Sequence, residues 1–61
     1  MAHTFEIYKD KAGEFRWRLQ ANNNEIVADS NEGYSTKQSC LHGIEVVKQI
    51  AAAAPINDLT A

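Results

Sequence analysis

Two stretches near the N-terminus alternate between apolar and polar residues, as half-buried β-strands do. We predict strands at residues 4–9 and 15–21. The second is the clearer, because apolar side chains recur at every other position from Phe15 to Ala21. The segment between them ends in Gly13, which can adopt the positive φ that a short hairpin loop needs. The two strands are therefore expected to pair antiparallel.

A third strand is predicted at residues 25–30, after a turn made of three asparagines at positions 22–24. Asparagine tolerates the left-handed backbone conformation better than most residues. In this strand Ile26 and Ala28 are expected to face the interior. The three strands together predict an antiparallel β-meander.

The apolar spacing then changes to that of a helix. Apolar residues recur three and four positions apart through residues 36–54, and they form one stripe. Ser35 is the predicted N-cap, because Ser-Thr-Lys-Gln fits a capping box, and Pro55 is the predicted stop. Gly43 lies within the stripe, which predicts a close approach of the helix to the Trp17 side of the sheet. The fold class is therefore α+β, in the order β-β-β-α, with a helix across one face and a short tail at 55–61.

The chain is short for a domain that folds alone. It has 61 residues, and a domain of about 60 residues buries only about 60% of the surface of its unfolded chain. Such domains usually gain stability from disulfides, a metal or a partner. The single Cys40 cannot form an internal disulfide, and no cluster of histidines, cysteines or carboxylates indicates a metal site. We expect no cofactor, and we predict a homodimer.

The length of the helix indicates where a second copy would bind. A helix of about 19 residues spans roughly 28 Å, whereas strands of about six or seven residues span about 20–23 Å. The alanine-rich end should therefore extend past the sheet, unless the tail folds back over it. The candidate dimer contacts are apolar residues on the flanks and at this end of the helix: Leu41, Val46, Ile50, Ala53 and Ala54.

Composition excludes several classes of function. The formal net charge of −2 at pH 7 argues against a generic polyanion binder, which would carry a basic stripe. No apolar run approaches the ~20 residues that a membrane-spanning helix needs, and no signal-peptide pattern is visible. With a single cysteine as well, a cytoplasmic location is expected.

The polar face of the predicted sheet offers an alternative, weak nucleic-acid or anion binding. It carries Tyr8, Arg16 and Arg18, and basic residues beside aromatic rings can bind phosphates and stack on bases. Lys37 would add charge at the helix start, where free amides attract anions. Acidic residues on the same face are expected to pair with the arginines. This pairing favours a non-catalytic assembly or interaction module, with an unknown protein partner, as the leading hypothesis.

Cys40 and His42 do not predict a catalytic pair. Residues two apart on a helix point about 200° away from each other, so the two side chains cannot meet within one chain. Cys40 lies on the apolar stripe and is expected to be a small buried hydrophobic residue. No catalytic residue is predicted, and we expect that the chain is not an enzyme.

Three motifs together resemble a known family. They read F-x-I-Y-K-D from Phe5, G-E-F-R-W-R-L-x-A from Gly13, and E-G-Y-S-T-K-x-x-C-x-x-G-I-x-x-V-K from Glu32. In these motifs the chain is similar to the YegP-like family of small bacterial domains of unknown function. The resemblance implies an α+β unit with an antiparallel sheet and a helix packed on it. It brings no catalytic or binding residue.

The resemblance also bears on assembly. Family members often carry the unit as a tandem repeat, which implies that two units form one body. This chain, residues 1–61, is expected to be a single YegP-like domain without an internal repeat, so a homodimer is the counterpart of the tandem form. One departure is the central turn, which is Asn22-Asn23-Asn24 where the family usually has a glycine after the first asparagine. It affects the expected turn type and not the fold.

Overall fold

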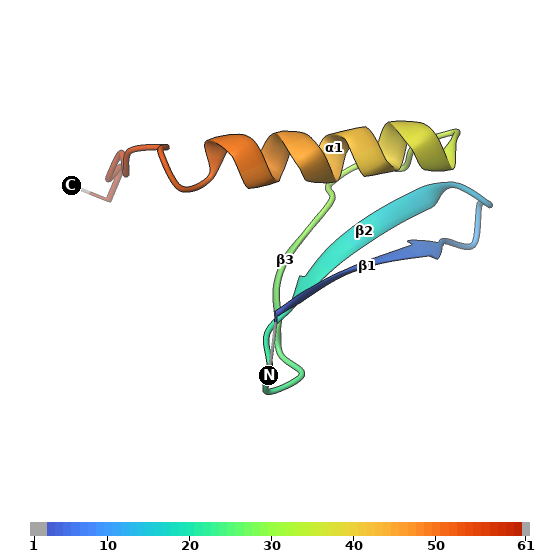
Figure 1. Cartoon of the computed structure of the whole chain (residues 1–61), viewed down its shortest axis with the longest axis horizontal. Helices are drawn as coiled ribbons and strands as arrows, with labels where there is room; N and C mark the ends of the chain where they lie inside the picture. Colours follow the sequence, from blue (N-terminus) through green and yellow to red (C-terminus); the bar gives the residue numbers. More distant parts are fainter. Residues whose placement is uncertain (1–2, 61) are drawn as a thin grey trace.

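A computed structural model describes residues 3–60 of the chain. Three antiparallel strands precede one helix, and the helix lies across one face of the sheet (Figure 1). The central strand is β2, in the order β1-β2-β3. This arrangement confirms the predicted β-β-β-α fold. The elements are β1 Thr4–Lys9, β2 Phe15–Gln20, β3 Ile26–Asp29 and α1 Lys37–Ile50.

Both hairpin loops have the same geometry. In the first, Gly13 N donates to Asp10 O over 3.0 Å, and in the second Asn24 N donates to Ala21 O over 3.0 Å. The last loop residue has a positive φ in each, 83° at Gly13 and 68° at Asn24. A turn followed by one left-handed residue is a common three-residue hairpin loop. The third asparagine therefore adopts in the second hairpin the conformation that glycine adopts in the first.

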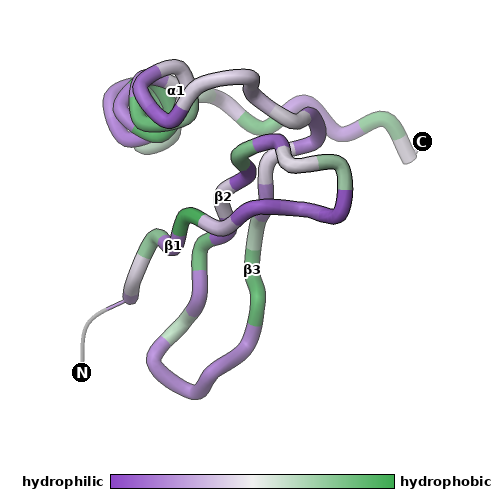
Figure 2. Tube along the Cα trace, turned by 90° about the vertical axis from the view of Figure 1, so that its right-hand side faces the viewer, coloured by the Kyte–Doolittle hydropathy of each residue, from purple (hydrophilic) through white to green (hydrophobic). Residues whose placement is uncertain are grey.

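Strand β3 is shorter and more exposed than its alternation predicts. The pairing with β2 slips between Leu19 and Gln20, so that Ile26 lies opposite Gln20 on the polar face. Ile26 is 47% exposed, and its predicted interior position is wrong. Ala28 keeps its place opposite Leu19, yet it is exposed as well. Figure 2, viewed nearly along α1, shows the reason: the helix is displaced away from β3.

The buried core is small and lies between β2 and α1. Trp17, Cys40 and Ile44 are the buried hydrophobic residues of the described chain, at 6%, 0% and 5% exposure. The ring of Trp17 meets that of Phe5 edge to face, with 5.6 Å between centroids. The partly buried residues around this cluster are Phe5, Ile7, Phe15, Leu19, Tyr34 and Val47.

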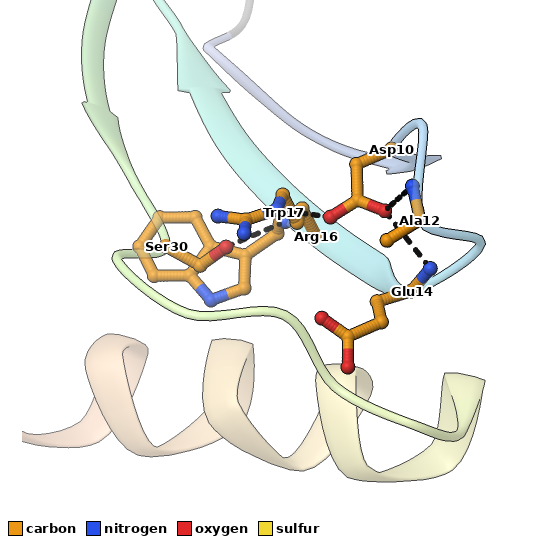
Figure 3. A network of polar contacts seen from close by, with 6 residues as sticks. All are labelled: Asp10, Ala12, Glu14, Arg16, Trp17 and Ser30. Carbon is orange, nitrogen blue, oxygen red and sulfur yellow. Dashed lines mark hydrogen bonds and ion pairs between the residues drawn. The ribbon is translucent and has the colours of Figure 1, made fainter.

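Ser30, which is buried, continues the pairing with β2 beyond the end of β3. Trp17 N donates to Ser30 Oγ over 3.1 Å, and Ser30 N donates to Trp17 O over 2.8 Å. Figure 3 shows the serine hydroxyl beside the Trp17 backbone. A side-chain oxygen thus replaces a strand carbonyl at this point, so the backbone of the central core residue is fully bonded.

Both ends of α1 differ from the prediction. The N-cap is Thr36 and not Ser35: Thr36 Oγ1 accepts from Ser39 N over 3.1 Å. The helix ends at Ile50, four residues earlier than predicted. After it the backbone hydrogen bonds span three residues instead of four. Ala53 N donates to Ile50 O over 3.2 Å, and Ala54 N donates to Ala51 O over 3.4 Å.

Pro55 limits the helix from its C-terminal side, because the residue before a proline, here Ala54, avoids the helical conformation; Ala51 still has helical angles, φ −62° and ψ −41°. The alanines favour a helix, but the proline follows them directly and the last turn tightens instead. The observed α1 of 14 residues spans about 21 Å, which is close to the length of a six-residue strand. The predicted long helical overhang is therefore reduced to its last residues and the tail.

Candidate functional site

Gly43 of α1 lies in close contact with side chains from the sheet side. A Cβ atom at this position would lie 2.6 Å from Tyr34 Oη, 3.1 Å from Tyr34 Cζ and 3.7 Å from Trp17 Nε1. The predicted close approach of Gly43 to the Trp17 side is thereby confirmed. Trp17 Nε1 is buried without a hydrogen-bond partner among the described residues. The tyrosine hydroxyl fills the notch that glycine leaves, so this feature belongs to packing.

The polar face of the sheet carries arginines that are already paired with carboxylates. Arg16 Nε lies 2.6 Å from Asp10 Oδ2, and Arg18 Nε lies 2.8 Å from Glu6 Oε1. The guanidinium of Arg18 also stacks over the Tyr8 ring, 4.9 Å from its centroid. Three of the four predicted polar-site residues, Tyr8, Arg16 and Arg18, thus gather on one face, within a network that neutralises its own charge.

Asp10 is a residue that the sequence analysis did not single out. Its carboxylate accepts from Ala12 N at 2.9 Å, from Glu14 N at 3.0 Å and from Arg16 Nε (Figure 3). The hydrogen bond from Arg16 is the largest of the effects that lower the pKa of Asp10, and the same bond raises the pKa of Arg16. An aspartate three residues before a loop glycine is a common turn signal, which could have identified it.

Lys37 lies apart from the other predicted polar-site residues. It is the first residue of α1, which packs on the Trp17 face, opposite the face of Arg16 and Arg18. The helix start is also satisfied locally, since Thr36 Oγ1 accepts from Ser39 N and Thr36 O accepts from Cys40 N. The structure therefore does not join Lys37 and the arginines in one anion site.

The five candidate dimer contacts are all exposed. Leu41, Val46 and Ile50 on α1 are 46%, 38% and 58% exposed, and Ala53 and Ala54 follow in the exposed turn. Leu41 and Val46 lie on opposite sides of the buried stripe of α1, so the five residues do not form one continuous surface.

Residues 55–60 do not fold back over these candidate contacts. Ile56 and Leu59 are 95% and 85% exposed, and the segment that carries them continues beyond the end of α1 (Figure 1). The tail has local order of its own, because Asp58 Oδ1 accepts from Thr60 N at 2.9 Å and from Thr60 Oγ1 at 2.6 Å.

Cys40 lies in the core and not in a reactive environment. It is 0% exposed, and burial raises the pKa of its thiol, which disfavours the nucleophilic thiolate. The prediction that it is a small buried hydrophobic residue is confirmed, and His42 is exposed on the helix. In residues 3–60 no three His, Cys, Asp or Glu side chains gather as a metal site would require. That part of the chain also has no helix of the length and apolarity needed to cross a membrane.

Comparison with known proteins places this fold in a family. The family described as Domain of unknown function (DUF1508) matches residues 10–58. The chain belongs to this family. A UPF0339 protein of Neisseria meningitidis serogroup B is 51% identical over 55 residues, which cover 90% of this chain and 96% of that relative. The resemblance to YegP-like proteins is thereby confirmed, and the family's function is unknown.

Two further family members bear on the fold and on the size of the unit. The solution structure of a protein from Haloferax volcanii matches with a TM-score of 0.87 at 45% identity, over 92% of this chain and 93% of that one. A UPF0339 protein of Stutzerimonas stutzeri is 59% identical over 51 residues, which cover 84% of this chain but 45% of the relative. The chain thus spans about half the length of that protein.

Proposed function

We propose that this chain is a small, non-catalytic, homodimeric module for assembly or interaction in the cytoplasm. The observation that carries the proposal is the imbalance between buried and exposed apolar residues. Within residues 3–60, three hydrophobic residues are buried, while seven large ones are exposed. So small a core is typical of domains that gain stability from a partner. The exposed residues are Ile26, Val27, Leu41, Val46, Ile50, Ile56 and Leu59.

The length of the Stutzerimonas relative supports the same proposal. The part of that protein that matches this chain is 45% of its length, which leaves room for a second unit of similar size. Two units in one chain could cover each other's exposed apolar residues. Two chains of one unit each could do the same. A homodimer is the arrangement open to a single-unit chain.

The state of association tests the proposal directly. We expect light scattering after size exclusion to give the dimer mass at tens of micromolar protein. Dilution should lower the melting temperature, because dimer stability depends on protomer concentration. A monomer mass at these concentrations, with a melting temperature that does not change on dilution, would contradict the proposal.

Weak nucleic-acid or anion binding stays the alternative. Its candidate residues on the polar face are Tyr8, Arg16 and Arg18, and the ion pairs of both arginines weigh against it, because the paired carboxylates already neutralise the arginines and would repel a phosphate. Titration of labelled single-stranded RNA at 50 and 200 mM salt separates the two functions. Phosphate-driven binding must weaken steeply with salt, whereas the assembly proposal expects no binding at either concentration.

A further inference from the structure

One row of residues across the polar face of the sheet alternates in charge. Glu6 of β1 lies opposite Arg18 of β2, and Arg18 lies opposite Asp29 of β3. Arg18 Nε donates to Glu6 Oε1 over 2.8 Å, so its charge is directed toward β1 and not toward β3. Within residues 3–60, neither a lysine nor an arginine forms an ion pair with Asp29. The row therefore ends at the edge of the sheet with an unpaired carboxylate.

The neighbouring row of the same face ends on an apolar residue. The β-bulge between β2 and β3 places Ile26 opposite Gln20, and Ile26 is exposed there. Side chains that lie directly opposite each other on neighbouring strands stabilise the sheet when a β-branched residue meets an aromatic one or a charge meets its opposite. A further strand beside β3 would therefore be matched by an aromatic residue opposite Ile26 and a basic residue opposite Asp29.

The outer edge of β3 also presents the backbone groups that a further strand needs. In an antiparallel pair, successive residues direct their N–H and C=O groups alternately toward the partner strand and away from it. Ser30 N donates to β2 over 2.8 Å, and Glu25 O accepts from the residue after β2 over 2.8 Å. The residues beside these two, Asp29 and Ile26, therefore direct their N–H and C=O groups outward.

The bulge does not block this edge. A bulge usually protects a sheet edge because it disturbs the regular spacing of the free groups. Here Val27 is the residue without a partner on β2, and the partners of its outward-facing neighbours, Gln20 and Arg18, are two residues apart. Two residues of an antiparallel strand span about 6.8 Å, which is the repeat of a regular edge. β3 also contains neither lysine nor proline, which commonly prevent strand addition.

The face of the sheet that carries α1 leaves room beside β3. The helix is displaced away from this strand (Figure 2), and Ala28, which pairs with Leu19, is exposed. At the opposite edge, Lys48 of α1 lies over the Phe5 ring of β1, and β1 ends in Lys9. The edge of β3 is therefore the more open of the two.

We propose that the outer edge of β3 binds an extended segment of another protein that carries a basic and an aromatic residue two positions apart. The segment adds to the sheet as an antiparallel strand, with the basic side chain beside Asp29 and the aromatic one beside Ile26. A second copy of this chain cannot supply the cation from its β3 or its tail, because residues 19–36 and 49–61 contain neither lysine nor arginine. The inference rests on the interaction role in the proposed function and does not require the homodimer.

Synthetic peptides test this pattern by nuclear magnetic resonance. The probe is Thr-Thr-Lys-Val-Tyr-Thr-Thr, because an antiparallel strand meets Asp29 before Ile26. One control peptide has Glu in place of Lys, and in the other Lys and Tyr exchange places. We expect millimolar probe to shift the amide signals of Ile26 and Asp29 and to slow their deuterium exchange, with the amides of Phe5 and Ile7 unchanged. The Glu peptide should bind about fivefold more weakly, because an attractive pair becomes a repulsive one.

Two substitutions in the protein locate the contact. Asp29→Asn keeps the size of the side chain and removes its charge, so we expect it to weaken probe binding about threefold and to abolish the preference over the Glu peptide. Glu45→Gln makes the same chemical change on α1 and should leave probe binding unchanged. Both residues are exposed, and the amide spectrum of each variant verifies that it is folded.

The outcomes separate this inference from the proposed homodimer. The inference is overturned if millimolar probe causes no shift at β3, if the Lys and Glu peptides bind equally, or if Asp29→Asn weakens binding no more than Glu45→Gln does. Tighter binding of the exchanged peptide would overturn the antiparallel direction. A dimer that does not bind the probe contradicts this inference alone, and a monomer that binds it contradicts the homodimer alone.

Discussion

Substitution of Gly43 by alanine tests the packing of α1 on the sheet. In a helix without contacts, this change stabilises by about 1 kcal/mol, because glycine has the larger backbone entropy in the unfolded chain. Here the added Cβ would lie 2.6 Å from Tyr34 Oη and 3.1 Å from Tyr34 Cζ. Tyr34 cannot withdraw freely, since its backbone N–H and C=O both bond to Phe15 at 2.8 Å. Overpacking of this kind costs about 1–3 kcal/mol. We therefore expect Gly43→Ala to lower the free energy of unfolding by about 1 kcal/mol.

Urea unfolding monitored by the single tryptophan measures this change, because Trp17 lies in the same contact. The matched control is Tyr34→Phe, which removes the nearest oxygen. In that background Gly43→Ala should be close to neutral or stabilising, and the double-mutant cycle should give a coupling of about 1–2 kcal/mol. A Gly43→Ala variant that is stabilised by about 1 kcal/mol in the wild-type background would refute the notch, since helix propensity alone would then explain the result.

Three further predictions concern the loop and cap residues. Thr36→Ala should destabilise the protein by about 1 kcal/mol through loss of the N-cap, whereas Ser35→Ala should change the urea midpoint little. A larger loss of stability in Ser35→Ala than in Thr36→Ala would show that Ser35 is the cap. Asn24→Ala should cost about 1 kcal/mol because its φ is positive, and Asn22→Ala in the same loop serves as the control. The pKa of Asp10 is lowered in the folded state, so its contribution to stability is present above its unfolded pKa of 3.8 and is lost as pH falls through the folded pKa. The stability gap between wild type and Asp10→Asn should therefore narrow from pH 7 to pH 2.5, and a gap that does not change with pH would contradict this linkage.

The parts of the fold that the sequence predicts are those with a strong repeating pattern. The alternation around Trp17 and the stripe through Cys40 and Ile44 predict the central strand and the buried helix face, and both are observed. The slip beside Ile26 was missed because a β-bulge adds one residue without a mark in composition. The helix end was missed because alanine propensity and Pro55 act in opposite directions, and only the three-dimensional backbone shows which of them prevails.

The candidate surfaces were predicted unevenly for a related reason. Exposure of Leu41 and Val46 follows from helical spacing alone, which needs no knowledge of the rest of the fold. The partner of Arg16 does not: Asp10 lies in a loop six residues away, and its position depends on the turn geometry. The mixture of acidic and basic residues predicted that this face neutralises its own charge. It did not predict which carboxylate pairs with which arginine.

The two candidate surfaces differ in what a ligand would have to displace. An anion at Arg16 would compete with a carboxylate at 2.6 Å, and one at Arg18 with a carboxylate at 2.8 Å. A partner at the exposed apolar residues of α1 would displace water from Val46 and Ile50, which are 38% and 58% exposed, and removal of apolar surface from water is favourable. This balance favours apolar contact on α1 over anion binding on the sheet.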